Sequence, residues 1–345
     1  MSVFVADAAN DITSAALQYF ARGPAMSQTM QKKPLLGFLR AGQKTFPGGK
    51  DNVVEHVKGT YMSSVAGFFS GYREDTAVTF TQSQNVLDAS YPWKEVHAGL
   101  VITWTELKKD GISIVENGRP SEHSEVGLTR LVGLLDDRLK DFAESWARAK
   151  NSMLWNDGTQ DADQVPGIQA LLPLNNTTGT VGGLAMATYA FWRHIVRENV
   201  GVSPQNQTLT EQVRADLIQL NRYGGEPNKA FCGSEFLAAL RSEVSEKGLY
   251  TQRGFEQGVS FGMGDLSVQG LGVFTYDPTL DDLDFEKRCY AIDGRRLRLR
   301  PMEGEDNKTI TPERPYNYMV FLKSMTWTGA LEVTQMNAHA IWTIA

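Results

Sequence analysis

The sequence predicts a mixed α+β protein, and three features of the chain carry this prediction. Residues 46–104 contain strand-like segments, residues 122–155 carry one long helical stripe, and the remaining residues mix short helices with short strands. The chain has 345 residues, of which 41% are hydrophobic and 21% charged, so one large core or two modest cores are expected. A net charge of −6 argues against nucleic-acid binding through overall positive charge, although it allows a local basic patch.

The first 45 residues carry little periodic pattern and are predicted to form an N-terminal arm. A turn or two of helix is expected between Ile12 and Phe20, before Gly23 and Pro24 end it. We expect this arm, up to Gly42, to become ordered only against a partner surface.

Residues 46–104 have the composition of strands. Val53–Val57 and Thr76–Thr81 are rich in β-branched residues, and apolar side chains alternate from Val96 to Trp104. Glycines punctuate the stretch between the first two segments. A long β-hairpin or small sheet is predicted, too polar to carry a large core of its own.

The strongest periodic signal predicts one long helix from about Glu122 to Trp155. Its length would be roughly 50 Å at about 1.5 Å per residue. An acid lies near its predicted start, and Asn156, Asp157 and Gly158 follow its predicted end. The flanking strands favour a helix that lies along a sheet over a coiled coil. The apolar stripe is formed by Leu128, Val132, Leu135, Leu139, Phe142, Trp146, Ala149 and Met153.

The rest of the chain is predicted as short helices and strands that follow a connector. Ser234 is the predicted N-terminal cap of its helix, and Gly224 with Gly225 should end the helix before it. The predicted order is a connector (Gln164–Gly183), a helix (Leu209–Leu220), a strand (Lys229–Cys232), a helix (Ser234–Ser245), strands and turns (Gly258–Tyr276), a strand with alternating arginines (Arg296–Arg300) and closing strands (Tyr316–Trp342).

No catalytic, cofactor or metal motif emerges from the sequence. There is no phosphate-binding glycine loop, and the five histidines (His56, His97, His123, His194, His339) share no zinc-like spacing with each other or with cysteine. We therefore predict no enzyme activity, no catalytic residues, no cofactor and no metal.

Two cysteines and one acidic cluster have ordinary structural interpretations. Cys232 and Cys289 are far apart in the sequence and are predicted to be buried thiols of a protein that stays in a reducing cytoplasm. The acids between Asp277 and Glu286 lack the ordered spacing of a calcium loop, so a solvated turn is predicted. No signal peptide and no bilayer-spanning run is recognisable, so no membrane partner is expected.

Two groups of residues are candidates for contacts between subunits. Phe68, Phe69, Tyr72, Arg73 and Trp93 lie in or next to the predicted hairpin, where the aromatic residues could anchor a neighbour or pack inside their own hairpin. Alternation places a second group, Arg296, Arg298 and Arg300, on one strand face, opposite two leucines. This basic face is compatible with an inter-subunit salt-bridge surface, a strip that faces DNA, or a solvated surface.

The order of these parts resembles the Hong Kong 97-type capsid fold of tailed-bacteriophage major capsid proteins. An N-terminal arm, a hairpin, a long helix, an α/β region and closing strands occur in the same order there. The motifs that carry the resemblance are Ala98–Thr103 before the helix, Val165-Pro166-Gly167-Ile168, Thr180–Leu184, Phe191-Trp192-Arg193, the strand and Tyr-Asp-Pro turn at Gly270–Pro278, Thr328–Leu331 and Asn337–Ala340.

The resemblance implies four domains. They are an N-terminal arm (1–45), an extended loop that reaches over a neighbouring subunit (46–104), a peripheral domain with the spine helix (105–165 and 301–345) and an axial domain at the centre of hexamers and pentamers (166–300). About 45 residues before the hairpin are too few for a built-in scaffolding segment, so a separate scaffolding protein or none is expected, without cleavage of the chain.

The function that the resemblance implies is structural. The chain would be a virion protein that self-assembles into hexamers and pentamers of an icosahedral head around double-stranded DNA, which it would hold without sequence specificity. Assembly would occur in the bacterial host cytoplasm, with a scaffolding protein and a portal as partners and a decoration protein as an optional one. A nanocompartment (encapsulin-like) shell protein is the alternative, and a cytosolic enzyme with an unrecognised site is a third reading.

Overall fold

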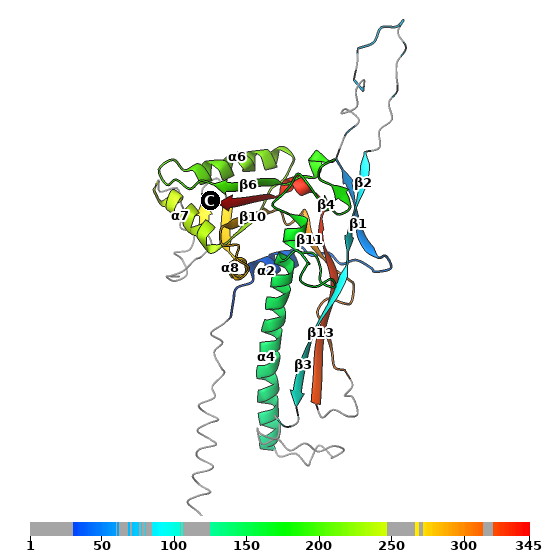
Figure 1. The fold of residues 1–345 in the computed structure, drawn as a ribbon. Helices are drawn as coiled ribbons and strands as arrows, with labels where there is room; N and C mark the ends of the chain where they lie inside the picture. Colours follow the sequence, from blue (N-terminus) through cyan, green and yellow to red (C-terminus); the bar gives the residue numbers. More distant parts are fainter. Residues whose placement is uncertain are drawn as a thin grey trace, which may run out of the picture. The chain divides into compact units, whose positions relative to one another are not determined.

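The structure is a computed structural model that describes residues 30–59, 61, 68–69, 71–75, 77, 80, 85–103, 105, 125–246, 266–268, 272–312 and 320–345. The chain divides into two compact units, residues 1–31 with 103–145 and residues 32–102 with 146–345. The second unit holds the sheets and both hydrophobic cores (Figure 1). No helix among the described residues is both long and apolar enough to cross a membrane.

A six-stranded sheet separates the two cores of the second unit. Its strand order is β6-β14-β10-β7-β9-β8, with parallel pairing of β14 to β6 and of β7 to β9 and antiparallel pairing elsewhere. The strands are β6 (Ile195–Val200), β7 (Lys229–Cys232), β8 (Leu266–Val268), β9 (Gly272–Tyr276), β10 (Arg288–Ile292) and β14 (Ala340–Ile344).

Strand alternation sends neighbouring side chains of this sheet into different cores. Cys289 and Trp342 point into the smaller core beneath helices α6 (Thr208–Arg222) and α7 (Ser234–Glu246), and Figure 1 shows α6 lying along the sheet next to β6. Phe231 and Tyr290, one residue away along their strands from such positions, point into the larger core.

The larger core lies where four further elements meet the sheet. Helix α2 (Pro34–Ala41), the C-terminal part of helix α4 (Glu125–Trp155) and strands β11 (Leu297–Pro301) and β13 (Val320–Val333) all contribute to it. Four fully buried tryptophans divide between the cores. Trp155, Trp192 and Trp327 lie in the larger core, and Trp342 lies in the smaller one.

A second sheet and a hairpin complete the unit. Strand β13 pairs with β11, β12 (Lys308–Ile310) and β3 (Lys94–Thr103), and Figure 1 shows β3 and β13 side by side. The hairpin is formed by β1 (Asn52–Lys58) and β2 (Val86–Pro92), which pair antiparallel. The shorter elements are α5 (Ile168–Leu171), β4 (Thr180–Val181), β5 (Leu184–Ala185), η3 (Ala190–Trp192), α8 (Pro278–Asp282) and η4 (Met336–Ala338).

Most elements predicted from periodicity are confirmed. The long helix ends at Trp155 as expected and is described from Glu125, and the predicted start at residues 122–124 lies outside the described part. Strand β7 has the predicted bounds, and Gly224, with φ +76, follows the end of α6. The cysteines are buried and free, with their sulfurs 3.3 Å apart on paired strands.

The predicted arm is wrong for its last residues. Helix α2 starts at Pro34, a favourable first helical residue, and buries Leu35, Leu36 and Leu39 at 0%, 4% and 1% exposure in the chain's own core. The Asn151 side-chain oxygen accepts a hydrogen bond from the Leu36 backbone N–H at 3.0 Å. This helix therefore needs no partner subunit to be ordered. The helical turn expected at residues 12–20 lies outside the described residues.

The strand predicted at Thr76–Thr81 is not the partner of β1. Ala77 and Phe80 are the described residues of that segment, and neither is in a strand. The partner is β2, which contains an Asp, a Ser and a Pro and so lacks a clear strand composition. The hairpin base is also less polar than predicted, because Val57, Ala89 and Tyr91 belong to the larger core.

Two acids of the acidic cluster, Asp277 and Asp281, have structural roles, contrary to the solvated turn predicted for them, whereas Asp282 and Asp284 are exposed as predicted. Asp277 is fully buried, caps α8 through the Thr279 N–H and accepts a hydrogen bond from the Trp155 indole at 3.0 Å. Asp281 accepts from the Ser234 backbone N–H at 2.9 Å, so the cap of α7 comes from α8 while Ser234 is the first helical residue. Glu243 of α7 in turn accepts from the backbone N–H groups of Leu209 and Thr210 in the first turn of α6.

Candidate assembly surfaces

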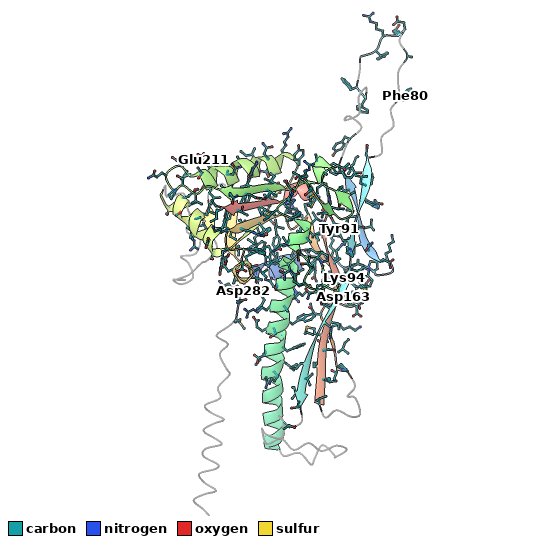
Figure 2. All side chains as sticks on the ribbon, in the orientation of Figure 1. Phe80, Tyr91, Lys94, Asp163, Glu211 and Asp282 are labelled. Carbon is teal, nitrogen blue, oxygen red and sulfur yellow. The ribbon has the colours of Figure 1, made fainter. Side chains whose placement is uncertain are left out.

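The base of the hairpin is fixed to the body of its own unit. The Tyr91 hydroxyl, on β2, donates a hydrogen bond to the Val333 carbonyl of β13 at 2.7 Å, and Figure 2 labels this side chain. The Ser90 N–H donates to the Gly182 carbonyl at 2.9 Å. Gly182 has φ +59, and a Cβ there would lie 3.1 Å from the Tyr91 ring, so the tight turn requires glycine. These contacts set the direction in which the hairpin leaves the body.

A buried ion cluster also ties the hairpin to the sheet. Arg300 of β11 binds Glu55 of β1 at 2.7 Å and lies 2.9 Å from a carboxylate oxygen of Glu332 on β13. The Glu332 side chain is fully buried and that of Arg300 is 17% exposed. Arg298 lies opposite Glu332 in the register of β11 and β13.

The charges of this cluster are not balanced around Arg300, because two carboxylates compete for one guanidinium. Burial raises the pKa of Glu332 to about 7; Arg300 opposes this shift and Glu55 adds to it. The protonation of Glu332 therefore changes near neutral pH, at the point where the hairpin joins the sheet.

The loop between β1 and β2 exposes several aromatic side chains. Phe69 is 97% exposed and Phe80 95%, and Figure 2 shows Phe80 well beyond the two strands. Tyr72 is 73% and Phe68 47% exposed. Burying a phenylalanine side chain is worth about 1.5–3 kcal/mol, so the exposed rings on this loop are candidates for burial against a partner.

The residues predicted as contacts fall into three places. Phe68, Phe69, Tyr72 and Arg73 all lie on the loop between β1 and β2. Trp93, between β2 and β3, is half-buried and donates its indole N–H to the Lys50 carbonyl at 2.8 Å, so it packs in its own hairpin region.

The three arginines do not form a single free basic face. Arg296 precedes the strand, in a turn where its N–H donates to the Asp293 carbonyl, and Arg300 is occupied by Glu55 and Glu332 of its own chain. Their role as subunit contacts stays a prediction.

Two kinds of candidate residue were missed by sequence reasoning. Phe80 was placed in a strand, where alternation would half-bury it, although an aromatic residue in a loop rich in Gly, Ser and Thr is itself a signal. Glu55 and Glu332 had no local signal, because only strand register brings them to Arg300.

The edge of the six-stranded sheet forms a second surface. Strand β6 is the last strand of the sheet, and Arg197, Glu198 and Asn199 on it are exposed. Arg197 makes a two-pronged contact with the buried Asp216 of α6, which also accepts from the Trp342 indole at 3.0 Å. An open edge strand offers backbone groups for pairing. Glu211, labelled in Figure 2, lies on the helix beside it.

The described residues contain little that suggests small-molecule chemistry. No group of three or more His, Cys, Asp or Glu side chains in this part of the chain is arranged to hold a metal ion. A cavity beneath α6, lined by Val213, Phe274 and Trp342 among others, has a volume of about 20 Å³, room for roughly one water molecule.

Comparison with solved structures identifies the fold. The capsid protein of cyanophage A-1(L) superimposes with a TM-score of 0.58 at 15% identity, covering 92% of this chain and 94% of that one. The capsid protein of Myoviridae phage XM1 gives a TM-score of 0.54 at 14% identity, covering 93% and 94%. The SrpI encapsulin of Synechococcus elongatus PCC 7942 gives 0.51 at 12% identity, covering 95% and 94%.

Sequence comparison adds no closer relative. The chain matches no known family profile, and no curated protein is significantly similar to it. The likeness nevertheless extends over more than nine-tenths of both chains in each of the three structures. The chain therefore has the Hong Kong 97-type capsid fold and resembles the major capsid proteins of tailed bacteriophages.

Proposed function

We propose that this chain is the major capsid protein of a tailed bacteriophage, which assembles into hexamers and pentamers of an icosahedral head around double-stranded DNA. The observation that carries the proposal is the likeness to phage capsid proteins over 92% and 93% of the chain. The exposed aromatic loop agrees with it, because a subunit that leaves Phe69 and Phe80 in water gains free energy by covering them with a neighbour.

The proposed roles of the parts follow the fold. Residues 46–104 would reach over a neighbouring subunit, residues 105–165 with 301–345 would form the peripheral domain, and residues 166–300 the axial domain. Residues 1–45 remain the proposed arm, with the correction that α2 belongs to the subunit's own core. Scaffolding, portal and decoration proteins, and packaged DNA, are the proposed partners, and the virion the proposed location.

A nanocompartment shell is the second candidate, favoured by the likeness to the SrpI encapsulin. The superposition covers 95% of this chain and 94% of the encapsulin, so chain length does not separate the two functions. The contents of the particle separate them, because a phage head encloses DNA and a nanocompartment encloses protein cargo.

Electron microscopy of the protein expressed alone and with a scaffolding partner tests the shell function. Closed icosahedral particles, tubes or sheets are expected, and monomers at every concentration would overturn the proposal. Particles from the producing cells are then treated with nuclease. Protected double-stranded DNA supports the phage head, whereas nucleic-acid-free particles filled with a second protein support the nanocompartment.

A further inference from the structure

A lysine, an asparagine and an aspartate meet between the C-terminal part of α4 and the loop before β12. Lys150 is on the helix, and Asp306 and Asn307 are in the loop. Two tryptophans cover the group, Trp146 one helical turn before Lys150 and Trp327 on β13. The Lys150 side chain is 2% exposed, although lysine usually keeps its amine in water.

An amine, an amide and a carboxylate lie within contact distance of one another. Lys150 Nζ lies 3.3 Å from Asn307 Oδ1 and 3.8 Å from Asp306 Oδ1. The same Asp306 oxygen accepts a hydrogen bond from Asn307 Nδ2 at 2.8 Å. Oδ1 of Asp306 is therefore close to both the amine and the amide nitrogen. The other oxygen of Asp306 accepts a hydrogen bond from Gln43 Nε2 at 3.4 Å.

The surroundings favour nucleophilic attack on the amide. The Trp146 indole N–H donates to Asn307 Oδ1 at 3.0 Å, which polarises the amide carbonyl as an oxyanion donor would. Burial lowers the pKa of Lys150 to about 7, with Arg40 adding to the shift and Asp306 opposing it. A large fraction of the amine is then neutral at physiological pH, and a neutral buried lysine is a good nucleophile.

We propose that Lys150 and Asn307 join in an intramolecular isopeptide bond, with Asp306 as the proton-transfer group. Lys150 Nζ forms a bond to Cγ of Asn307, and the oxyanion at Oδ1 stays hydrogen-bonded to Trp146. Asp306 takes a proton from Nζ and passes it to Nδ2, the Cγ–Nδ2 bond breaks, and one ammonia leaves. The reaction exchanges one amide for another and needs no oxidant or cofactor, since the fold supplies proximity.

The bond would join residues 157 positions apart in the sequence. It would fasten the end of α4 to the loop that leads into β12, within a single chain. A bond within one subunit leaves the chain at its monomer position on a denaturing gel, unlike a bond between subunits.

Intact-mass measurement of the denatured full-length protein tests the proposal, on monomers and on any particles. A mass lower than the sequence mass by one ammonia is expected, together with a branched peptide containing residues 150 and 307 and loss of tryptic cleavage after Lys150. Asp306→Asn keeps the amine and the amide but removes the proton carrier, so it should have its full sequence mass. Lys308→Arg, at an exposed neighbouring lysine, should lose ammonia as the unchanged protein does.

The proposal is overturned if the folded unchanged protein has its full mass after prolonged incubation at pH 8. It is equally overturned if the lost ammonia maps to another residue. Circular dichroism of Asp306→Asn confirms that the variant is folded, and Lys150→Arg gives a second chain that cannot form the bond. These measurements do not depend on whether the protein forms a shell.

Discussion

At the scale of single residues, the buried acids and histidines control how stability depends on pH. Glu332 faces Arg300, Glu55, Tyr91 and, across the strand pair, Arg298. Its pKa in the folded chain, about 7, is above its ordinary value, so folding favours its protonated form. Glu332 therefore contributes stability at low pH, and this contribution is lost as the pH rises through about 7.

Glu332→Gln removes this titration while keeping the shape of the side chain. Relative to the unchanged protein, the variant should gain about 2 kcal/mol of unfolding free energy between pH 5 and pH 8. Urea unfolding of the isolated subunit at both pH values measures this difference. Glu303→Gln, at an exposed acid, is the control, and parallel pH profiles for Glu332→Gln and the unchanged protein would refute the prediction.

Two buried histidines act in the opposite direction. Burial lowers the pKa of His194 to about 4 and that of His339 to about 3. The charged or titratable groups that act on His339 are His194, Asp293 and Arg296. The His339 Nδ1 accepts from the Asp293 N–H at 3.2 Å. Both rings are neutral in the fold but take up protons when the chain unfolds, so their contribution to stability is lost as the pH falls below about 6.5.

His339→Asn should reduce this acid sensitivity. Both chains compared carry Glu332→Gln, which removes the opposing titration. Between pH 7 and pH 5 the chain with His339 should lose about 2 kcal/mol more unfolding free energy than the chain that also carries His339→Asn. His97→Asn changes an exposed histidine and should leave the acid sensitivity as it is. An equal loss in His339→Asn and His97→Asn would show that His339 is not the sensitive group.

At the scale of elements, α2 contributes to the folding of the subunit, whereas the proposed arm before it is expected to contribute to assembly. Its three buried leucines pack in the larger core, and Phe38 meets Phe231 edge to face at 5.5 Å. Removing a buried leucine side chain typically costs about 2–5 kcal/mol. The helix is therefore part of the subunit's own stability, although it follows directly on the proposed arm.

Two truncations test this division. Removing residues 1–29 should leave the thermal unfolding of the subunit unchanged and impair shell formation, whereas removing residues 1–41 should unfold the subunit or make it insoluble. Leu39→Ala in the full chain should lower the unfolding free energy by about 2–5 kcal/mol. A stable, soluble chain after the longer truncation would contradict the structural role of α2.

Local pattern made much of the fold predictable from the sequence. The spine helix, β3 and β7 follow from their own periodicity, because each buries one stripe or one face. Elements set by tertiary contacts were missed. Helix α2 is too short to stand alone, and β2 gains strand structure from pairing with β1.

The functional groups were harder to predict than the elements. Asp277 and Asp281 were taken for surface acids because their partners, Trp155 and Ser234, are far away in the sequence. Three of the exposed aromatic residues on the loop, Phe68, Phe69 and Tyr72, were recognised from the composition of the segment, whereas Phe80 was not. The contacts of Glu332 and Lys150 depend on register and on packing between distant elements, which no local pattern encodes.

At the scale of the whole molecule, the described part of the subunit has two hydrophobic cores and a loop whose aromatic side chains are exposed to solvent. The cores are closed on both faces of the six-stranded sheet. The loop between β1 and β2, in contrast, holds Phe69 and Phe80 almost fully in water. Folding of the subunit and coverage of this loop are therefore separable, and association should depend on the loop far more than subunit stability does.

The double variant Phe69→Ser with Phe80→Ser tests this separation. Because neither ring packs in its own subunit, the unfolding free energy should change by less than about 0.5 kcal/mol. If both rings are half-covered by a neighbour, assembly loses about 1 kcal/mol for each, and the critical concentration for particle formation rises roughly 30-fold. Light scattering across a concentration series, with electron microscopy of the products, measures this shift.

Ile218→Ser, at a 65% exposed apolar residue on α6, serves as the control. Unchanged assembly of the double variant would mean that the loop stays uncovered in the shell, and an equal defect in the control would mean that any loss of surface apolarity impairs assembly.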